Sequence, residues 1–449
     1  MCGIAGFVGD HARHNTSRMI ALIKHRGPDG MSLWDNGTVS MGHAHLKITG
    51  DASQPVISGD RVVTYNGEIY NFTHFLPGTS DTTALADAIL KNGAESFLKA
   101  APSIDGEYAF AYYDGSKLML ARDPVGIKPL FYGKNHEGLG FASEKKALMH
   151  IGIEDIHALN PGCIYVDGKE QKAISLPPYR GDITDPGEAA DQLDKALREA
   201  VRLRVHENAA VAFSGGVDCA LVGAMSGLPL CTVGLEGSYD VKAAKKAASL
   251  MGAEHLVYEF SEKDVVEVLP DVIYSVESAD PMKVSIALPI YILAREARKS
   301  GYKVLLSGQG ADELFGGYSR YAEAGGSSKL GEMLQSDLEQ IAGNNLERDD
   351  AAAMAHGVEM RVPYLDLAVI GISQRIDTSL KVYFDGKDYI RKYILRFLSE
   401  KYLPDEIASA PKKAIQYGTG VQKTLEKLAK SEGYKGTGDY FKSLYKVVF

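Results

Sequence analysis

The chain has 449 residues, of which 45% are hydrophobic and 24% are charged, and its formal net charge is -9. This balance is typical of a soluble globular protein, and the length suggests about two to four domains. The negative charge, without any polybasic block, argues against nucleic acid as an electrostatic partner. No stretch approaches the ~20 apolar residues that a membrane-spanning helix needs, so we expect no membrane association.

The four cysteines are Cys2, Cys163, Cys219 and Cys231. They have no CxxC spacing and are too sparse for a disulfide framework, which favours a reducing compartment. The first residues, MCGIAGFVGDHARH, lack a basic region and turn polar too early for a signal peptide. We therefore expect a cytoplasmic protein.

Residues 1 to about 150 are rich in short β-type runs that Gly, Asp and Asn turn signals separate. The runs are GIAGFVG, VVTYNGEIY, YAFAYYDG, KLMLARD and PLFYG, and helical patterns near Ser17–Lys24 and Thr82–Leu90 interrupt them. This predicts an α+β domain of stacked antiparallel sheets. The pattern weakens around Asp155–Asp185, where NPG, LPP and DPG indicate a linker or domain margin.

From about Glu188, strand and helix signals alternate, which predicts an α/β domain with a parallel sheet covered by helices. AAVAFSG, PLCTVGL and KVLLSG are the strand candidates, and CALVGAM opens a helix. Apolar residues recur at three- and four-residue spacing over Val241–Met251, as on one face of a helix. The last hundred residues are mostly helical in pattern. We predict a first domain over 2–150, a linker over 151–187 and a second domain over 188–449.

Cys2 becomes the N-terminal residue if Met1 is removed, and it then carries a thiol and a free α-amine together. An α-amine has an ordinary pKa of about 8, so part of it is a free base at neutral pH. It can accept the thiol proton directly or through a water, and no separate histidine is needed. Position alone, however, favours an ordinary small residue near a terminus.

Six motifs in series change that interpretation: CGIAGFVG, HRGPDG, YNGEIYN, SDTTAL, ARDPVGIKPLFY and FASEKKAL. Together they resemble the class II, N-terminal-nucleophile glutamine amidotransferase domain of asparagine synthetases over nearly all of residues 1–150. The resemblance implies that the Asn66 side chain and the Gly67 backbone N–H stabilise the oxyanion of a thioester mechanism. It also implies that Glu68 and Asp81 hold the α-ammonium of glutamine. Taken singly, Asn-Gly is a common hairpin turn and Asp81 a helix cap.

One segment departs from the family pattern. The family usually has GHxRLSI, whose Arg binds the glutamine carboxylate, and this chain has GHAHLKI. His45 stands at the Arg position and Lys47 follows two residues later, and neither reproduces the bidentate fork of Arg. We expect weaker glutamine binding, or binding through Lys47, and free ammonia is an alternative nitrogen source.

Two motifs of the second half resemble nucleotide-binding segments. SGGVDC, Ser214–Cys219, resembles the PP-loop (SGGxDS) of enzymes that cleave ATP between the α and β phosphates, with Cys219 in place of Ser. Standing alone it could be a simple strand-to-helix turn. LSGQGADELFGGY resembles the asparagine synthetase segment whose Asp helps to hold Mg²⁺. The resemblance implies Asp218 and Asp312 as Mg²⁺ ligands, although Asp312 also suits a helix N-terminus. It implies ATP contacts from Phe213, Ser214, Gly215, Gly216, Asp218, Cys219, Val233, Ser307 and Gly308.

HGVEMRVPYLD and YLPDEIASAPKKAIQYGTG match two further family segments. The second carries an essential Lys in the family, which corresponds to Lys412, with Lys413 as the close alternative. At the acceptor site, Gln309 replaces the usual Glu of SGEGxDE and cannot act as a base.

The resemblance therefore implies ATP- and Mg²⁺-dependent amidation of aspartate to asparagine through an acyl-adenylate, with glutamine or ammonia as nitrogen source. Two alternatives stay open. The same chemistry could serve another carboxylate, as in the related β-lactam-forming synthetases, or the chain could be a non-catalytic homologue. A homodimer is a further expectation that the resemblance carries.

Overall fold

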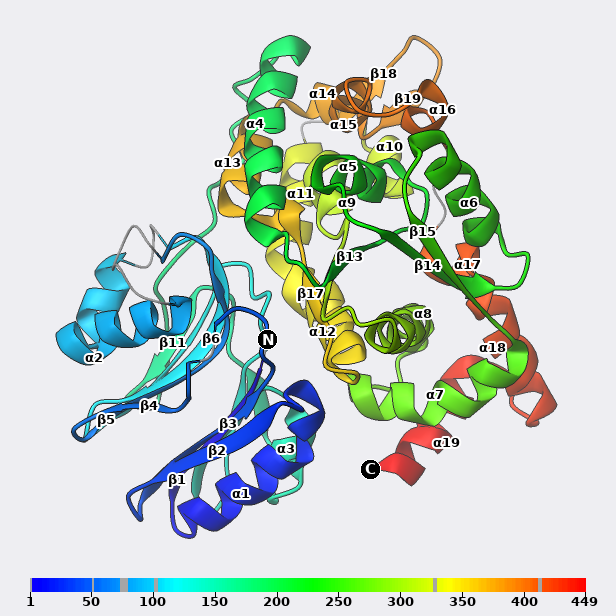
Figure 1. Ribbon diagram of the computed structural model, residues 1–449. Coiled ribbons are helices and arrows are strands. Elements are labelled where there is room, and N and C mark those ends of the chain that lie inside the picture. The colour runs from blue at the N-terminus through cyan, green and yellow to red at the C-terminus, as the bar shows by residue number, and fades with distance from the viewer. Residues whose placement is uncertain (1, 51, 73–79, 101–103, 326–328, 411–413) are drawn as a thin grey trace. The chain divides into compact units, whose positions relative to one another are not determined.

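The computed structural model describes residues 2–50, 52–72, 80–100, 104–325, 329–410 and 414–449 (Figure 1). The chain divides into two compact units. Unit 1 comprises Met1–Ser175 with Met354–Gly357, and unit 2 comprises Leu176–Ala353 with Val358–Phe449.

Unit 1 contains two six-stranded antiparallel sheets. The first runs in the order β10 (Ile156–Ala158), β8 (Phe131–Lys134), β9 (Gly138–Ala142), β1 (Gly3–Gly9), β3 (Val39–His45) and β2 (Gly30–Asp35). The second runs in the order β12 (Lys169–Lys172), β11 (Cys163–Val166), β7 (Leu118–Arg122), β6 (Gly106–Tyr113), β5 (Arg61–Ile69) and β4 (Val56–Ser58). Cys2 directly precedes β1, His45 ends β3, and Asn66, Gly67 and Glu68 lie on β5.

Three buried clusters define the layers of unit 1. Ile4 of β1 and Leu120 of β7 belong to the cluster between the two sheets. Phe7 packs with residues of helices α1 (Ala12–Leu22) and α3 (Lys145–Met149), on the opposite face of β1 because strand side chains alternate. A third cluster joins β5 and β6 to α2 (Asp81–Ala100). Unit 1 is therefore a helix–sheet–sheet–helix stack (Figure 1).

The strands expected from the sequence are present, but α1 begins at Ala12 rather than near Ser17. Its buried face includes Asn15 and Thr16, which hydrogen-bond to Glu137 at 2.7 Å and to the Ser40 carbonyl at 3.2 Å. Because these polar side chains lie on the buried face, the apolar residues of the helix do not recur at helical spacing in the sequence. Strands β10, β11 and β12 lie within the segment expected as a linker. β10 pairs with β8, β11 pairs with β7, and β12 pairs with β11. The domain limits expected from the sequence stay a prediction.

Unit 2 is built on a five-stranded parallel sheet in the order β15 (His255–Phe260), β14 (Leu230–Leu235), β13 (Ala209–Ala212), β16 (Val304–Leu306) and β17 (Glu359–Arg361). Five helices accompany the strands: α4 (Pro186–Arg204), α5 (Val217–Ser226), α6 (Tyr239–Met251), α7 (Glu262–Val276) and α8 (Pro281–Lys299). Helices α5 and α8 cover opposite faces of the sheet (Figure 1). The strand order reverses between β13 and β16, and in such sheets this is where ligands bind, beyond the carboxyl ends of the strands.

The rest of unit 2 is mostly helical, and this confirms the predicted fold class. The helices are α9 (Ala311–Phe315), α10 (Ser319–Glu323), α11 (Lys329–Ile341), α12 (Glu347–Met354), α13 (Leu367–Arg375), α14 (Thr378–Lys381), α15 (Tyr393–Ser399), α16 (Asp405–Ala408), α17 (Ile415–Gly418), α18 (Val421–Ser431) and α19 (Thr437–Val448). Strands β18 (Val382–Phe384) and β19 (Tyr389–Arg391) form a small hairpin. Among the described residues, no helix is both long and apolar enough to cross a membrane.

Candidate active sites

Cys2 lies directly before β1, whose antiparallel register with β3 pairs Gly3 with Ala44. Continuing that register places Cys2 opposite His45. His43 lies two residues before His45 on the same face of β3. The Cys2 sulfur and one ring nitrogen of each histidine all lie within 4.8 Å of one another. The unusual residue at position 45 is therefore a direct neighbour of the predicted nucleophile.

Asn66 links the second sheet to Cys2. The backbone nitrogen of Cys2 donates to the side-chain oxygen Oδ1 of Asn66 at 2.9 Å. Because a backbone N–H can only donate, this contact fixes the orientation of the amide. Asn66 is fully buried, and its Nδ2 has no hydrogen-bond partner among the described residues. A buried donor beside the thiol has the chemistry of an oxyanion-stabilising group.

Gly67 follows with φ +150°, and a Cβ at this position would lie 2.0 Å from the Glu107 carbonyl oxygen. Only glycine therefore fits this point of β5. Glu68 is buried next along the strand, and it lies opposite Glu107 of β6. The Asn-Gly pair lies inside a nine-residue strand and not in a hairpin turn.

Asp81 reaches β5 from the first residue of α2. Its Oδ2 accepts from the Tyr65 hydroxyl at 3.0 Å and from the Ile69 backbone at 3.1 Å. Its Oδ1 accepts from the Thr82 backbone at 2.6 Å, within the first turn of the helix. Burial raises the pKa of Asp81 although these donors act against the rise. Asp81 thus contacts the same strand as Glu68.

The remaining predicted glutamine contact differs from these. The Lys47 side chain is exposed, and its backbone nitrogen donates to Asp29 Oδ2 at 2.8 Å. The structure thus brings Cys2, His45, Asn66 and Gly67 together, with Lys47 at the surface beyond the end of β3.

Arg26 and His43 also lie near Cys2, and neither has a role predicted from the sequence. Arg26 is fully buried and donates to the Cys2 carbonyl at 3.2 Å and to Glu144 at 3.0 Å. Burial opposes ionisation of Glu144, but the charges of His25, Lys146 and Arg26 hold its pKa well below the usual value. For His43, burial and the neighbouring His45 lower the pKa to about 3. Arg26 stands in HRGPDG, so that motif was the available signal.

In unit 2, a cavity of about 540 Å³ lies at the ends of β13, β14 and β16. Most of the nucleotide-contacting residues predicted from the sequence line it: Phe213, Ser214, Asp218, Cys219, Val233, Ser307 and Gly308, together with Gln309 and Asp312. Gly215 and Gly216 instead line a second cavity of about 650 Å³, which Ser214 shares and which also contains Lys242 and Lys246. The PP-loop candidate therefore borders both cavities, and the second has the cations that a phosphate chain needs.

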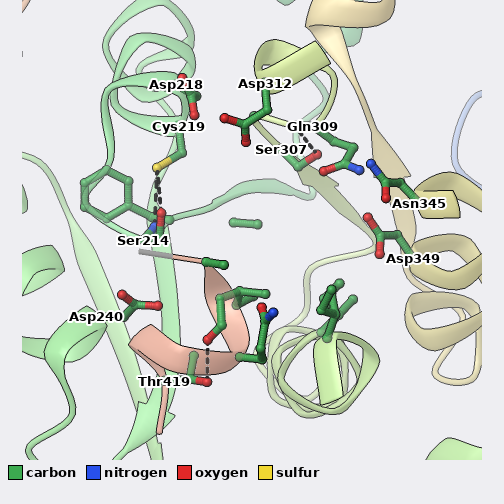
Figure 2. A pocket seen from close by; sticks show the side chains of 18 of the residues that line it. Ser214, Asp218, Cys219, Asp240, Ser307, Gln309, Asp312, Asn345, Asp349 and Thr419 are labelled. Carbon is green, nitrogen blue, oxygen red and sulfur yellow. Dashed lines mark hydrogen bonds between the residues drawn. The ribbon is translucent and has the colours of Figure 1, made fainter. Parts of the chain in front are cut away.

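The Cys219 thiol closes the loop that precedes α5 (Figure 2). Its sulfur lies 3.3 Å from the Ser214 backbone nitrogen and 3.5 Å from the Ser214 hydroxyl, and the thiol donates to the Gly216 carbonyl at 3.2 Å. Gly215 has φ +78°, and a Cβ there would meet the backbone of Ala243 at 2.9 Å. The contacts of the Cys219 thiol are thus with the loop itself, and they stabilise its conformation.

Asp218 and Asp312 converge on one cation, the ammonium group of Lys392, which lies 2.6 Å from each carboxylate. Gly317 makes room for this contact, because a Cβ there would lie 1.7 Å from the Asp312 Oδ1 atom and 2.2 Å from Lys392 Cε. The Tyr364 hydroxyl, from the HGVEMRVPYLD segment, donates to the Asp218 carbonyl at 3.1 Å. The sequence missed Lys392, because no recognised motif surrounds it.

Gln309, Asn345 and Asp349 are directed toward one end of the cavity that Asp218 and Asp312 line (Figure 2). The Gln309 backbone nitrogen donates to the Ser307 hydroxyl at 3.3 Å, and Asn345 donates to Glu313 at 2.7 Å. Arg348 donates to the buried Asp349 at 2.8 Å. Burial raises the pKa of Asp349 although the Arg348 charge opposes the rise. This end is polar on several sides, as a site for a charged acceptor requires.

The predicted Lys412, and its alternative Lys413, lie outside the described residues. The described residues on either side of them line the two cavities. Ala410 lines the cavity that Gly215 and Gly216 border, and Ala414 lines the cavity that Asp218 borders.

Comparison with known proteins bears on both units. Residues 1–160 match the family model of a glutamine amidotransferase domain, and residues 192–329 and 322–436 match that of asparagine synthase. The chain is 32% identical to a putative glutamine-hydrolysing asparagine synthetase of Methanocaldococcus jannaschii, over 97% of this chain and 96% of the relative. It is 31% identical to the glutamine-hydrolysing asparagine synthetase of Sandersonia aurantiaca, over 94% and 87%.

Among solved structures, glutamine phosphoribosylpyrophosphate amidotransferase from B. subtilis is 16% identical, over 68% of this chain and 81% of that one. Its TM-score of 0.36 is too low for residue-level comparison.

The two matched domains define a glutamine-dependent carbon–nitrogen ligase, in which an amidotransferase domain precedes a synthetase domain. Within that class, the chain belongs to the asparagine synthase family, whose members use ATP.

Proposed function

We propose that this protein converts aspartate to asparagine, with glutamine as the nitrogen donor and ATP as the activating substrate. In the glutaminase step, Cys2 is the nucleophile once Met1 has been removed. Its α-amine accepts the thiol proton, and the sulfur attacks the side-chain carbonyl carbon of glutamine. Asn66 Nδ2 and the Gly67 N–H stabilise the oxyanion. Return of the proton to the nitrogen releases ammonia, and water then hydrolyses the thioester to glutamate.

Glutamine itself is held at both ends in this proposal. Glu68 and Asp81 bind its α-ammonium, because a cation offsets the cost of burying each carboxylate. His45 or Lys47 binds its α-carboxylate. A lone imidazole or ammonium replaces a bidentate fork there, so a high KM for glutamine is expected.

In the synthetase step, an oxygen of the acceptor carboxylate attacks the α-phosphorus of ATP, and pyrophosphate leaves. The loop Ser214–Gly216 binds the phosphates through backbone N–H groups at the start of α5. Ammonia then attacks the carbonyl carbon of the acyl-adenylate, loses a proton and displaces AMP. Lys412 is proposed to stabilise the charge on the α-phosphate as pyrophosphate leaves.

Asp218 and Asp312 are the proposed Mg²⁺ ligands. The supporting observation is that both carboxylates already converge on one cationic nitrogen at 2.6 Å, so their oxygens point at a common volume. Mg²⁺ takes one or two protein carboxylates together with phosphate oxygens and waters. When bound, it would neutralise charge on the phosphates beside Lys392.

One observation carries the proposal more than any other: a single cavity is lined by the PP-loop candidate, by both converging aspartates and by the polar group around Gln309. Nucleotide and acceptor can thus meet in one space. The test is to incubate the protein with aspartate, Mg-ATP and either glutamine or ammonia. We expect asparagine, AMP and pyrophosphate in equal amounts, and Cys2→Ala should retain only the ammonia-dependent reaction. Failure to form asparagine from either nitrogen source would refute aspartate as the acceptor.

Gln309 supports a second candidate, which keeps the chemistry and changes the acceptor. A carboxylate at this position could accept the proton that ammonia loses, whereas the amide of Gln309 cannot. Screening carboxylic acids by AMP release identifies the acceptor if aspartate gives none. Absence of AMP release with every acid, in a folded protein that binds ATP, would instead indicate a non-catalytic homologue.

A further inference from the structure

We propose that Cys2, His43 and His45 form a binding site for a thiolate- and imidazole-preferring divalent cation, of which Zn²⁺ fits best. The proposal goes beyond amide synthesis, because neither half-reaction uses a metal at Cys2. It starts from a cluster of three ligand atoms, one sulfur and two ring nitrogens, all within 4.8 Å of one another. Among the described residues, this is the one group of three or more such side chains found close enough to share a metal ion.

The strand register makes this cluster a built feature of the sheet. His43 and His45 share one face of β3 because they are two residues apart, and Cys2 lies opposite His45 where β1 begins. β3 is paired on both sides, with β1 and with β2, so its backbone is held in place. Side chains that project from fixed, adjacent strands lose little further freedom when a metal binds.

The distances fit a small tetrahedral ion after a modest contraction. Zn–S bonds of about 2.3 Å and Zn–N bonds of about 2.0–2.1 Å put neighbouring ligand atoms roughly 3.4–3.6 Å apart. The three atoms lie within 4.8 Å of one another, so each separation must shrink by at most roughly 1.2–1.4 Å to reach these values, which small side-chain torsions can achieve. The three atoms are therefore placed around a volume of the right size.

The environment of the His43 ring is a second, independent observation that points to a bound metal ion. The ring is fully buried, and neither nitrogen has a hydrogen-bond partner of normal geometry among the described residues. The Tyr65 backbone acts on the ring as a hydrogen-bonding group that raises its pKa, and this influence is smaller than those of burial and of His45. A buried imidazole normally has a partner for at least one nitrogen, because an unsatisfied buried polar group destabilises the fold. A metal ion at the cluster would satisfy it.

The donor set selects the metal. One sulfur and two imidazoles suit Zn²⁺, whereas Mg²⁺ and Ca²⁺ prefer oxygen ligands. Binding converts the Cys2 thiol to the thiolate, and its proton passes to solvent. A water, or the Cys2 α-amine after removal of Met1, completes the fourth position. The family's usual Arg at position 45 is always protonated and cannot ligate a metal, so His45 creates the site in this chain.

A metal ion on the Cys2 sulfur also has a functional consequence, which rests on the proposed glutaminase role. The bound thiolate cannot attack glutamine, so Zn²⁺ would switch off glutamine hydrolysis. The synthetase domain would still accept free ammonia. The cluster then acts as a metal-sensitive switch between two nitrogen sources.

The direct test uses Co²⁺ as a spectroscopic probe for Zn²⁺ on the full-length protein. We expect one equivalent of Co²⁺ to give a sulfur-to-cobalt charge-transfer band that Zn²⁺ abolishes by displacement. Cys2→Ser should lose the band, and His45→Arg should weaken binding at least tenfold, as loss of a metal-site group typically does. His157→Ala and Cys163→Ser are the matched controls. His157 is half exposed and Cys163 lies on β11, and neither belongs to the cluster of ligand atoms. A band that survives in both site variants, or that is absent from the wild type, would overturn the proposal.

A second measurement covers the case in which the variants fail to fold. In the wild type, alkylation of Cys2 by iodoacetamide is followed by peptide mass spectrometry with and without Zn²⁺. We expect at least tenfold slower labelling with Zn²⁺, reversed by a chelator, and unchanged labelling would count against the site. Glutamate release from glutamine, measured without ATP, should fall at least tenfold with Zn²⁺. If the protein hydrolyses no glutamine at all, the proposed function fails, while the cobalt spectrum still decides the metal site.

Discussion

The backbone nitrogen of Cys2 donates to Oδ1 of Asn66 at 2.9 Å. The contact fixes the orientation of the Asn66 amide, whose nitrogen Nδ2 is a donor with no hydrogen-bond partner among the described residues. One side chain thus holds the main chain of Cys2, the proposed nucleophile, and has a second hydrogen-bonding group for the oxyanion of the proposed reaction. The two roles are separable by substitution.

Asn66→Ala should lower glutamine hydrolysis by about 100- to 1,000-fold, the usual effect of removing one oxyanion donor. Asn66→Asp keeps the acceptor for Cys2 and loses the donor, so it should be as impaired as the alanine variant. Steady-state glutamate release checks both, and ammonia-dependent AMP release serves as the internal control and should change less than twofold. Activity close to wild type in Asn66→Asp would show that the amide nitrogen does not serve the oxyanion.

Lys392 is the cation that holds Asp218 and Asp312 together. Lys392→Met leaves two carboxylates facing one another, so we expect a loss of about 3–5 kcal/mol in the free energy of unfolding, as when a buried pair loses one partner. If the two aspartates also bind Mg²⁺, millimolar Mg²⁺ should recover part of this loss in the variant. Thermal unfolding with and without Mg²⁺ measures both effects.

The matched control for Lys392 is Lys401→Met. Lys401 also lies 2.8 Å from an aspartate, Asp191, but both side chains are well exposed. Such a surface pair is worth about 0–1 kcal/mol. Equal destabilisation in the two variants would mean that the convergence of Asp218 and Asp312 on Lys392 has no special weight.

The Cys219 thiol links Ser214 to Gly216 within the loop that we propose binds phosphate. Cys219→Val has nearly the same shape and no polar atom, so the loop loses these contacts, and we expect KM for ATP to rise about five- to tenfold, or ~1 kcal/mol. Cys219→Ser restores a hydroxyl, which is a stronger donor than a thiol, and should keep KM within threefold of wild type. Initial-rate assays check this, with Cys163→Val as the control for thiol removal. An unchanged KM in Cys219→Val would assign the loop's order to its backbone alone.

The sequence predicted the strands well because short apolar runs bounded by Gly and Asp report burial directly, as in Gly3–Gly9 and Leu230–Leu235. It placed the start of α1 too late because Asn15 and Thr16 are buried by hydrogen bonds, which hydrophobic periodicity does not record. The strands β10–β12 were not expected because they are only three or four residues long and add to sheet edges that form elsewhere in the chain.

The site residues that the sequence predicts stand inside recognisable motifs, whereas Lys392 and His43 carry no predicted role. Asn66 and Asp218 stand in patterns that chemistry makes recognisable. Lys392 lies 174 residues from Asp218 in the chain and meets it only through the fold. The same holds for the cluster at Cys2: the sequence showed an unusual His45, but only the pairing of β1 with β3 shows that His43, His45 and Cys2 meet. Which residues of two distant strands face each other cannot be predicted from local sequence patterns alone.

Lys381 in α14 is almost fully buried, and its Nζ lies 5.4 Å from the centre of the Tyr179 ring. Burial lowers its pKa to about 7, although the Asp377 charge opposes the fall. The unfolded chain, with a pKa of about 10.4, then binds more protons between pH 7 and 10.4, so this group makes stability rise with pH across that window. Its destabilising effect is full below pH 7.

Lys381→Met should therefore stabilise the protein by about 2–4 kcal/mol at pH 6, with a gain that shrinks as pH rises and vanishes near pH 10.4. The substitution stabilises the protein because the folded state binds the Lys381 proton less tightly than the unfolded state does. Urea unfolding midpoints at pH 6, 8 and 10 measure the trend. Lys427→Met, at an exposed pair with Glu262, should change stability by less than about 1 kcal/mol at every pH. A gain for Lys381→Met that is the same at pH 6 and pH 10 would show that removal of a charge is not its cause.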